Sequence, residues 1–382
     1  MRSLVRRAVG VLVVIHGLIH VMGSLEGFGW ARLSRFTEPI TTVGGFAWLI
    51  AGVSVVASGA MLISGARGWW AVATVAALAS QCVITTSWTD AKAGTAVNIV
   101  LLVAAIYGFR AHGPTSYRAQ FRRLSNQTVS AVAASSGSPS GPVTEADLEH
   151  LPPPVADYLR AVGAVGRPHV LGFRAAIRGR IRSGSDQPWM PWTGAQVNTF
   201  GSAPSRVFYM DATMKGLPTD VLHAYVGPTA RMQVRLASLK TIIDASGPEM
   251  DQAETVTLLN DMCVLAPAAL VDARIEWTPV DDHRALATFT NAGHKVSATL
   301  TFDDDHELVD FVSDDRSVSS RDGRSFSPQR WSTPIADYRS FNGRRVGAFG
   351  RAQWHPADEP AFDYLEFHAD DISYLEAPAP RA

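Results

Sequence analysis

The chain opens with four runs of apolar residues separated by short polar segments, at 8–23, 42–64, 69–88 and 95–109. The two middle runs have about 20 residues, the length that an α-helix needs to cross about 30 Å of hydrocarbon. The outer runs have about 15 residues, which is also the length of a buried helix. Tryptophans stand near several run ends, where amphipathic rings settle at membrane surfaces. The pattern predicts an α-helical module of four membrane spans over residues 1–112.

Residues 113–148 have a different composition, rich in Ser, Ala, Gly and Pro, and we expect a flexible linker there. The run LPPPVADYLRAVG (151–163) then places apolar residues at helical spacing behind prolines, which predicts a short helix. Beyond it, apolar and polar residues alternate, as in strands with one buried face. The alternation is clear in FRAAIRGRIR (173–182), RMQVRLA (231–237) and KVSATLTF (295–302), and it is less clean in RRVGAFGRAQWH (344–355).

One helical segment interrupts the strands, at 248–272. Pro248 and Glu249 suit a first helical turn, and Pro267 suits the start of a second short helix. An antiparallel meander of about ten strands would leave its concave apolar face in water unless such a segment covered it. We therefore expect residues 149–378 to form an α+β soluble domain, in which a curved antiparallel sheet, a half-barrel, is covered by helices.

A cavity between this helical cover and the sheet is the natural place for a ligand. Aromatic residues and methionines supply large and adaptable apolar surface at such sites, although most of them are ordinary core. The residues expected to line the ligand site are Phe208, Met210, Met232, Met250, Trp277 and Trp331.

Charge is balanced over the whole chain, with 34 Lys and Arg against 35 Asp and Glu, so no global field attracts nucleic acid. The two cysteines, Cys82 and Cys263, allow neither a disulfide framework nor a thiolate metal site. Around the apolar runs the cations are biased to one side. Arg2, Arg6, Arg7, Arg67, Arg110, Arg118, Arg122 and Arg123 fall on that side, and Arg32, Arg35 and Lys92 fall on the other. The bias predicts a multi-pass inner-membrane protein whose soluble domain is cytoplasmic.

Two histidines, His16 and His20, share one face of the first run, because residues four apart on a helix point the same way. Ser80, Gln81 and Asn98 are expected to converge on the same interior. The favoured interpretation is hydrogen bonding between helices. The alternatives are a metal or haem site, and a ligand pocket or proton-linked role. Neither a third histidine nor a carboxylate accompanies the pair within a run, so we expect no metal and no cofactor.

Acidic residues stand beside arginines in VSDDRS (312–317) and RWSTPIADYRSF (330–341). Asp314, Asp315 and Asp337 are the candidates for acid/base chemistry, because a neighbouring charge shifts a carboxyl pKa. Ion pairs at the rim of a sheet are the commoner outcome of such a pattern. The chain has no HExxH, CxxC or GxSxG motif, so neither zinc chemistry nor a serine hydrolase is indicated.

The order of these segments resembles a known family. HGLIH, WTDAKAGT, LPPPVADYLR and RWSTPIADYRSFNGRR together resemble an uncharacterised bacterial family of multi-pass membrane proteins that is defined by a domain of unknown function. The soluble part also resembles the half-barrels of the lipoprotein-localisation factors, in which a curved antiparallel sheet is closed by helices over an apolar cavity. That second resemblance implies a lipid-binding architecture, but those carriers work outside the cytoplasmic membrane.

These observations favour a membrane-anchored binding protein, with the lipid bilayer and a lipid or other apolar small molecule as its partners. One alternative is a membrane-associated enzyme that acts on an apolar substrate through Asp314, Asp315 or Asp337. The other is a structural or assembly protein, which requires no cavity. The sequence does not specify the oligomeric state.

Overall fold

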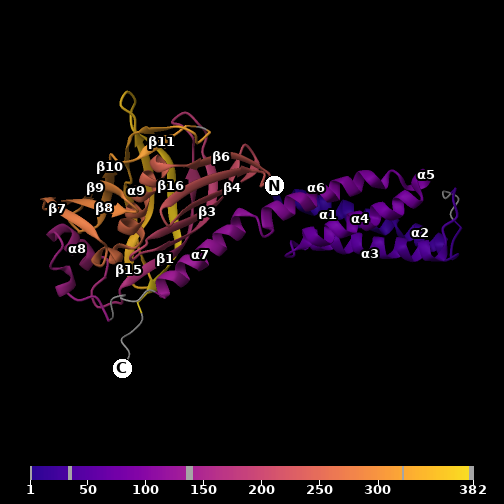
Figure 1. The fold of residues 1–382 in the computed structure, drawn as a ribbon, viewed down its shortest axis with the longest axis horizontal. Coiled ribbons are helices and arrows are strands. Elements are labelled where there is room, and N and C mark those ends of the chain that lie inside the picture. The colour runs from indigo at the N-terminus through magenta and orange to yellow at the C-terminus, as the bar shows by residue number, and fades with distance from the viewer. Residues whose placement is uncertain (1, 33–36, 135–140, 321, 378–382) are drawn as a thin grey trace. The chain divides into compact units, whose positions relative to one another are not determined.

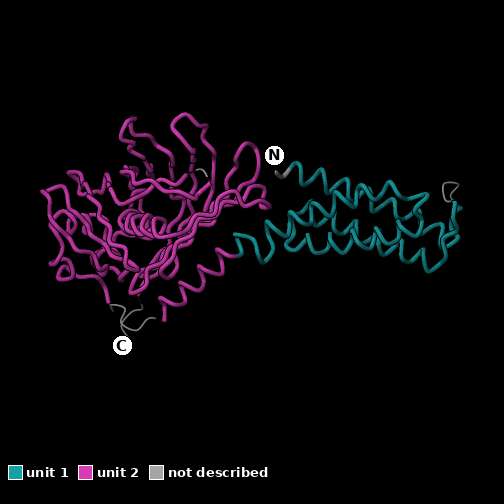
Figure 2. The backbone as a smooth tube through the Cα atoms, turned by 45° about the horizontal axis from the view of Figure 1, so that its top comes forward, with its two compact units in different colours: residues 1–119 teal, residues 120–382 magenta. Residues whose placement is uncertain are grey.

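The computed structural model describes residues 2–32, 37–134, 141–320 and 322–377, and it divides into two compact units (Figures 1 and 2). Unit 1 comprises residues 1–119 and unit 2 comprises residues 120–382. Each unit has its own apolar core. Arg35 of the cation pattern, residues 135–140 of the expected linker and residue 378 lie outside the described residues.

The described part of unit 1 is built from helices. Four stretches are long and apolar enough to cross a membrane, judged by length and composition: Leu4–Gly27, Thr42–Ser64, Trp69–Thr86 and part of Gly94–Ala133. The helices of unit 1 are α1 (Arg2–Ile19), α2 (Val21–Gly27), α3 (Thr42–Ser64), α4 (Trp69–Thr86), α5 (Trp88–Ala91) and α6 (Gly94–His112).

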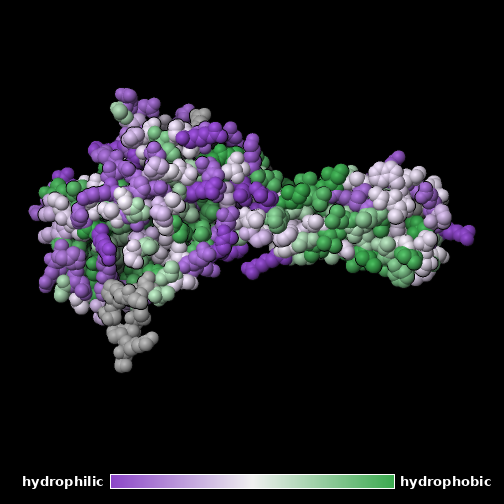
Figure 3. Space-filling model, in the orientation of Figure 1, coloured by the Kyte–Doolittle hydropathy of each residue, from purple (hydrophilic) through white to green (hydrophobic). Residues whose placement is uncertain are grey.

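The surface of unit 1 is apolar. Among the described residues, all but three of the exposed large apolar side chains belong to unit 1, the exceptions being Leu217, Leu239 and Val280 in unit 2. Figure 3 shows these apolar side chains over the helices and a more polar surface over the strands. Helices that expose apolar side chains all round are typical of membrane spans, because lipid replaces water around them.

Small residues set the distance between α1 and α3. A Cβ atom at Gly17 would lie 2.8 Å from the backbone nitrogen of Val56 and 3.0 Å from the carbonyl oxygen of Gly52. Two turns earlier in α1, a Cβ atom at Gly10 would lie 3.1 Å from the carbonyl oxygen of Gly59. Lipid is as apolar as the helix surfaces, so helices in a membrane associate without a hydrophobic driving force. They rely on close packing of this kind, which small residues allow.

Unit 2 contains α7 (Tyr117–Ala133, which begins just before the unit boundary), η1 (Ala146–Leu148), α8 (Pro153–Ala161), α9 (Pro248–Leu265) and η2 (Pro267–Val271). The structure differs here from the flexible linker expected over 113–148, because α7 occupies a large part of it. Arg, Gln, Ala and Leu in its first turns are good helix formers. The ring of Phe121 also packs beside Tyr209, with 6.2 Å between centroids.

The rest of unit 2 is strands. They are β1 (Val170–Ile181), β2 (Met190–Thr199), β3 (Ser205–Met214), β4 (Leu217–Val226), β5 (Thr229–Leu236), β6 (Lys240–Ser246), β7 (Ile275–Asp281), β8 (Arg284–Asn291), β9 (His294–Phe302), β10 (Leu308–Ser313), β11 (Ser317–Ser319), β12 (Phe326–Pro328), β13 (Arg330–Ser332), β14 (Ile335–Phe341), β15 (Arg344–His355) and β16 (Phe362–Glu376).

Fourteen of these strands form one antiparallel sheet. Its order is β6-β5-β4-β3-β2-β1-β16-β15-β13-β10-β9-β8-β7, with β14 paired to β15, while β11 and β12 form a separate pair. The first and last strands, β1 and β16, pair at the centre of the sheet. Their ladder is the longest in the sheet, and it joins the half formed by β1–β6 to the half formed by β7–β10 and β13–β16. The sheet curves strongly but its edges β6 and β7 do not pair, so it is a half-barrel (Figure 1).

The helix α9 lies inside the curve of this sheet (Figures 1 and 2). It packs against β5 and β6 of one half and against β8, β9 and β10 of the other. Hydrogen bonds to other elements hold both helix ends: Asp251 of α9 accepts from the backbone N–H of Ala230 in β5, and the hydroxyl of Tyr158 in α8 donates to the carbonyl oxygen of Cys263 at 2.9 Å. The bond from Tyr158 satisfies a carbonyl group in the last turn of α9, where backbone acceptors have no partner within the helix.

The predicted fold class is confirmed: a helical module is followed by a curved antiparallel half-barrel covered by helices. The helical insertion expected at 248–272 corresponds to α9 and η2. The strand count of about ten is too low, because three-residue strands such as β11, β12 and β13 are too short to show an alternation.

Candidate functional site

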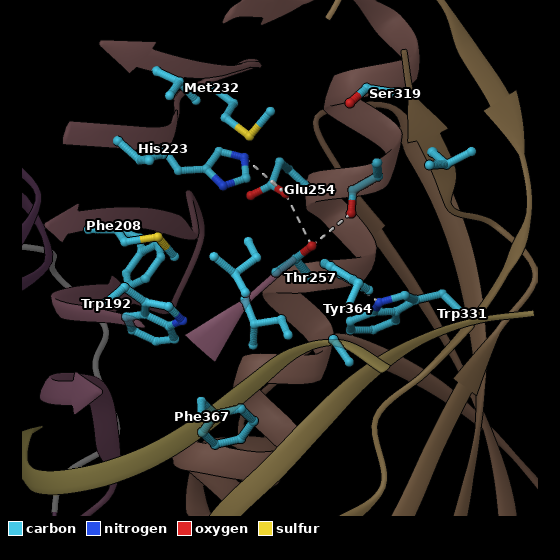
Figure 4. A pocket seen from close by; sticks show the side chains of 18 of the residues that line it. Trp192, Phe208, His223, Met232, Glu254, Thr257, Ser319, Trp331, Tyr364 and Phe367 are labelled. Atoms are coloured by element: carbon cyan, nitrogen blue, oxygen red, sulfur yellow. Dashed lines mark hydrogen bonds and ion pairs between the residues drawn. The ribbon is translucent and has the colours of Figure 1, made fainter. Parts of the chain in front are cut away.

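A cavity of about 610 Å³ lies in unit 2 between α9 and the curved sheet. Its size falls in the range of small-molecule sites, which is about 300–1,000 Å³. Figure 4 shows Trp192 and Phe208 on one wall and Trp331 and Tyr364 on the other, with Glu254 and Thr257 of α9 between them. The lining is mostly apolar, and methionine, aromatic and aliphatic side chains come from strands of both halves of the sheet.

Five of the six residues expected at a ligand site line this cavity: Phe208, Met210, Met232, Met250 and Trp331. The alternation along β3 turns Phe208, Met210 and Ala212 to the same side. Trp277 is not among the lining residues. It stands on β7, an edge strand whose side chains are mostly exposed, and it is half-buried against the core.

The three acids considered for acid/base chemistry lie outside the cavity lining. Asp314 pairs with Arg330 at 2.7 Å on the surface, and the hydrogen bond from that guanidinium lowers the pKa of the carboxyl. Asp337 forms an ion pair with Arg339 at the surface. Asp315 accepts from the backbone N–H and the hydroxyl of Ser297 at 2.6 and 2.9 Å, which fixes the chain after β10.

A buried group of charged side chains lies at the cavity wall and was not predicted from the sequence. Arg206 of β3 donates through Nε to Asp261 at 2.6 Å and through Nη1 to Glu254 at 3.2 Å. Nε2 of His223 lies 3.2 Å from Oε1 of Glu254, and Nη2 of Arg316 lies 3.9 Å from the same oxygen. The Glu254 side chain is fully buried. We call these five residues, Arg206, His223, Glu254, Asp261 and Arg316, the charge cluster.

Polar neighbours complete the charge cluster. Oδ2 of Asp261 also accepts from the side-chain amides of Gln196 at 2.6 Å and Asn198 at 3.0 Å, both on the inward face of β2. The hydroxyl of Thr257 donates to Glu254 at 3.1 Å. Figure 4 shows this bond together with the ion pair from His223. Oδ2 of Asp261 and both oxygens of Glu254 therefore have protein donors, as buried carboxylates require.

The charges in the cluster stabilise one another's ionised forms. Burial favours the neutral form of Glu254, but His223, Arg206 and Arg316 outweigh burial and hold the pKa of Glu254 well below its usual value. Burial likewise disfavours the charged form of Arg206, but Asp261 and Glu254 outweigh it, so the pKa of Arg206 is raised. Both groups stay charged across the physiological range, and neither is suited to carry a proton in a reaction.

Aromatic rings hold the second arginine of the cluster. The guanidinium carbon of Arg316 lies 4.4 Å from the centroid of the Trp331 ring and 5.6 Å from that of Trp354. Guanidinium stacks on such rings while keeping its N–H edge available. Arg316 thus presents a flat, positively charged surface among the apolar lining residues.

A weak sequence signal pointed to the charge cluster. Glu254 and Asp261 are seven residues apart, which is two helical turns, and they lie among apolar residues in the segment expected to cover the sheet. Two acids on one face of an otherwise apolar helix require buried partners. The partners could not be deduced, because Arg206, His223 and Arg316 come from β3, β4 and the chain after β10, and only the fold brings them together.

In unit 1, the histidine pair makes contacts between helices. Nε2 of His20 lies 2.8 Å from the hydroxyl oxygen of Ser80, and its Nδ1 lies 3.0 Å from the carbonyl oxygen of His16. Nε2 of His16 lies 3.2 Å from Oδ1 of Asn98, whose amide nitrogen donates to Gln81. These are the residues expected to converge, and their contacts fit the hydrogen-bonding interpretation. No group of three or more His, Cys, Asp or Glu able to hold a metal occurs within the described residues.

Comparisons with solved structures found two similar proteins: a domain described as a putative outer membrane lipoprotein-sorting protein domain from Vibrio parahaemolyticus, and a DUF1329 family protein from Desulfovibrio piger. The first is 11% identical with a TM-score of 0.32, and the alignment covers 53% of this chain and 85% of that chain. The second is 13% identical with a TM-score of 0.34, covering 58% and 91%.

No curated protein matches the chain. A family model does match, over residues 141–367, which is more than half of the chain and includes most of the sheet and all of α9. The expected membership of an uncharacterised family is confirmed. The chain belongs to the family of unknown function DUF6544.

Proposed function

We propose that this protein is a membrane-anchored binding protein that takes a lipid or another apolar molecule into the cavity between α9 and the sheet. The observation that carries the proposal is the cavity itself, which has about 610 Å³ of space and a mostly apolar lining. Protein interiors are normally packed without voids of this size. A cavity this large is therefore a candidate ligand site.

Two further observations support the proposal. The apolar surface of unit 1 fits an anchor in the bilayer, which is where apolar ligands are found. The methionines Met210, Met232 and Met250 in the lining are flexible and polarizable, so they suit chains of varying shape. The enzyme alternative has less support, because Asp314 and Asp337 are paired at the surface and the cluster acids are saturated by donors.

Photochemical labelling tests the proposal. We would incubate the purified full chain in detergent with a fatty-acid methyl ester that carries a diazirine, irradiate, and map the labelled peptides by mass spectrometry. Binding in the cavity labels peptides of β2, β3 and α9. Labelling confined to the helices of unit 1 would contradict the proposal, because it would mean that the probe only coats the apolar surface.

A variant that fills the cavity provides the matched comparison. Ala212 is buried on β3 and lines the cavity, so Ala212→Trp places an indole in the ligand's space. Ala336 is exposed on β14 and serves as the control position for the same substitution. Labelling of β2, β3 and α9 should be lost in Ala212→Trp and retained in Ala336→Trp. Equal labelling of both variants would show that the probe is bound elsewhere.

A further inference from the structure

The charge cluster leaves more hydrogen-bond donors than acceptors to meet a ligand. Among its acceptors, Oδ2 of Asp261 receives three donors, and both oxygens of Glu254 have partners. The donors are not all engaged. Nδ2 of Asn260, Nε1 of Trp192 and Nε of Arg316 have no hydrogen-bond partner among the described residues.

These three unpartnered donors belong to residues that line the cavity. Asn260 is 6% exposed and Trp192 is 4% exposed, so neither can rely on bulk water. Asn260 stands three residues after Thr257 on α9, which puts it on the helix face that turns to the cavity. Trp192 stands four residues before Gln196 on β2, on the inward face. Indole and guanidinium N–H groups can only donate, and the same holds for an amide nitrogen.

The charged side chains of the cluster already face one another. Arg206 and Arg316 face Glu254 and Asp261, and Nε2 of His223 lies 3.2 Å from Glu254. Arg182, a further arginine of the lining, donates to the backbone carbonyl oxygens of Asp363 and Ser185. A charged headgroup would therefore have to displace a partner that is already in place or enter the site unpaired.

We infer that the cavity selects a ligand whose polar group accepts hydrogen bonds and carries no charge, and whose remainder is apolar. The ester carbonyl of an acyl lipid has this chemistry. Its oxygen offers lone pairs to the donors of Asn260, Trp192 or Arg316, while its chains occupy the apolar space. A fatty amine brings donors and a positive charge, and a free fatty acid brings a negative charge beside the carboxylates of Glu254 and Asp261. The inference rests on the proposed function and specifies its ligand class.

Competition against the photoprobe tests this selectivity. The competitors share one chain length and differ only in the head group: hexadecane, methyl palmitate, palmitate and hexadecylamine. Each is added to the full-length protein in detergent at pH 8. Methyl palmitate should compete about tenfold better than hexadecane, as expected for one buried donor that gains a partner. Palmitate and hexadecylamine should compete less well than methyl palmitate.

Variants of the donor residues distinguish binding at the cavity from partitioning of the competitors into detergent, because partitioning is the same for every protein variant. Asn260→Leu should reduce the preference for methyl palmitate over hexadecane while hexadecane still competes. Trp192→Phe should do the same and provides a second measurement if Asn260→Leu does not fold. Asn291→Leu is the matched control, because Asn291 is also a buried asparagine but does not line the cavity, so the preference should be unchanged.

The outcomes distinguish the two proposals. If no competitor displaces the probe from β2, β3 and α9, the proposed binding function fails. If all apolar competitors displace it but methyl palmitate is no better than hexadecane, binding stands and the inferred ester preference fails. The inference is also overturned if palmitate or hexadecylamine competes best, or if the ester preference survives in both Asn260→Leu and Trp192→Phe.

Discussion

At the scale of single residues, the most demanding feature is a fully buried carboxylate inside a cavity that is otherwise mostly apolar. Glu254 is ionised there because Arg206, His223, Arg316 and Thr257 surround it. Removing one member of such a group leaves the others charged and unpaired, which costs more than the group contributes in total. The cluster therefore acts as a unit, and it links α9 to β3 and β4 across the cavity wall.

The first prediction concerns Glu254→Gln. Near neutral pH, this change should lower the free energy of unfolding by about 3–5 kcal/mol, the usual cost of breaking a buried ion pair. Because the pKa of Glu254 is lower in the folded than in the unfolded state, the unfolded state takes up the proton first as pH falls. As the pH is lowered past about 4.3, the ordinary glutamate pKa, the free energy of unfolding of the wild type should therefore decrease. The difference in free energy of unfolding between wild type and variant should then become smaller.

Pulse proteolysis of unit 2 in the full chain, over a urea series at pH 7 and at lower pH, measures both effects. Glu276→Gln is the control, because Glu276 pairs with Lys295 on the surface with 78% of its side chain exposed, so removal should cost at most about 1 kcal/mol. A gap between Glu254→Gln and wild type that stays constant down to acid pH would contradict the linkage.

At the scale of elements, the sequence predicted those parts whose side chains repeat with a period. The strands β1, β5, β9 and β15 alternate strictly enough to be recognised, and α9 carries apolar residues at helical spacing between proline and turn signals. The helix α7 was missed because its sequence is mostly polar and its start lies in a segment read from composition alone. The unexpected property of α9 is that nearly all of its residues are buried, including acids, because sheet surrounds it on several sides.

The second prediction compares two leucines of α9. Leu259 is fully buried and does not line the cavity, whereas Leu265 is buried and lines it. Leu259→Ala should lower the free energy of unfolding by about 4–5 kcal/mol, since it opens a new void in close packing. Leu265→Ala should cost only about 2–3 kcal/mol, because its cavity side has fewer contacts to lose.

Urea denaturation of the full chain followed by pulse proteolysis measures the two leucine variants under one condition. The same substitution at Leu239, which is exposed, should change the stability by no more than about 0.5 kcal/mol. Equal losses for Leu259→Ala and Leu265→Ala would mean that the space beside Leu265 is packed as tightly as the core behind Leu259, and the cavity argument would fail with it.

At the scale of the whole molecule, the chain joins a unit with an apolar surface to a unit with a more polar surface (Figure 3). The second unit also contains the mostly apolar cavity. A binding protein anchored as proposed would meet its ligand at the membrane by diffusion over short distances, so it would gain effective concentration without further contacts. The side of the membrane on which it would act depends on the orientation of the spans, and the cations around them are the sequence feature that sets this orientation.

The last prediction is that unit 2 lies on the cytoplasmic side. Arg6, Arg7, Arg67 and Arg110 stand at one set of helix ends and Lys92 at the other, and flanks rich in Lys and Arg stay inside. In a bacterial host, green fluorescent protein fused after residue 382 should fluoresce, and alkaline phosphatase fused there should be inactive. Phosphatase fused after Ala91, between α4 and α6, should be active, which shows that the assay reports both sides. Active phosphatase after residue 382 would place the cavity outside, and the ligand pool would then be that of the outer leaflet.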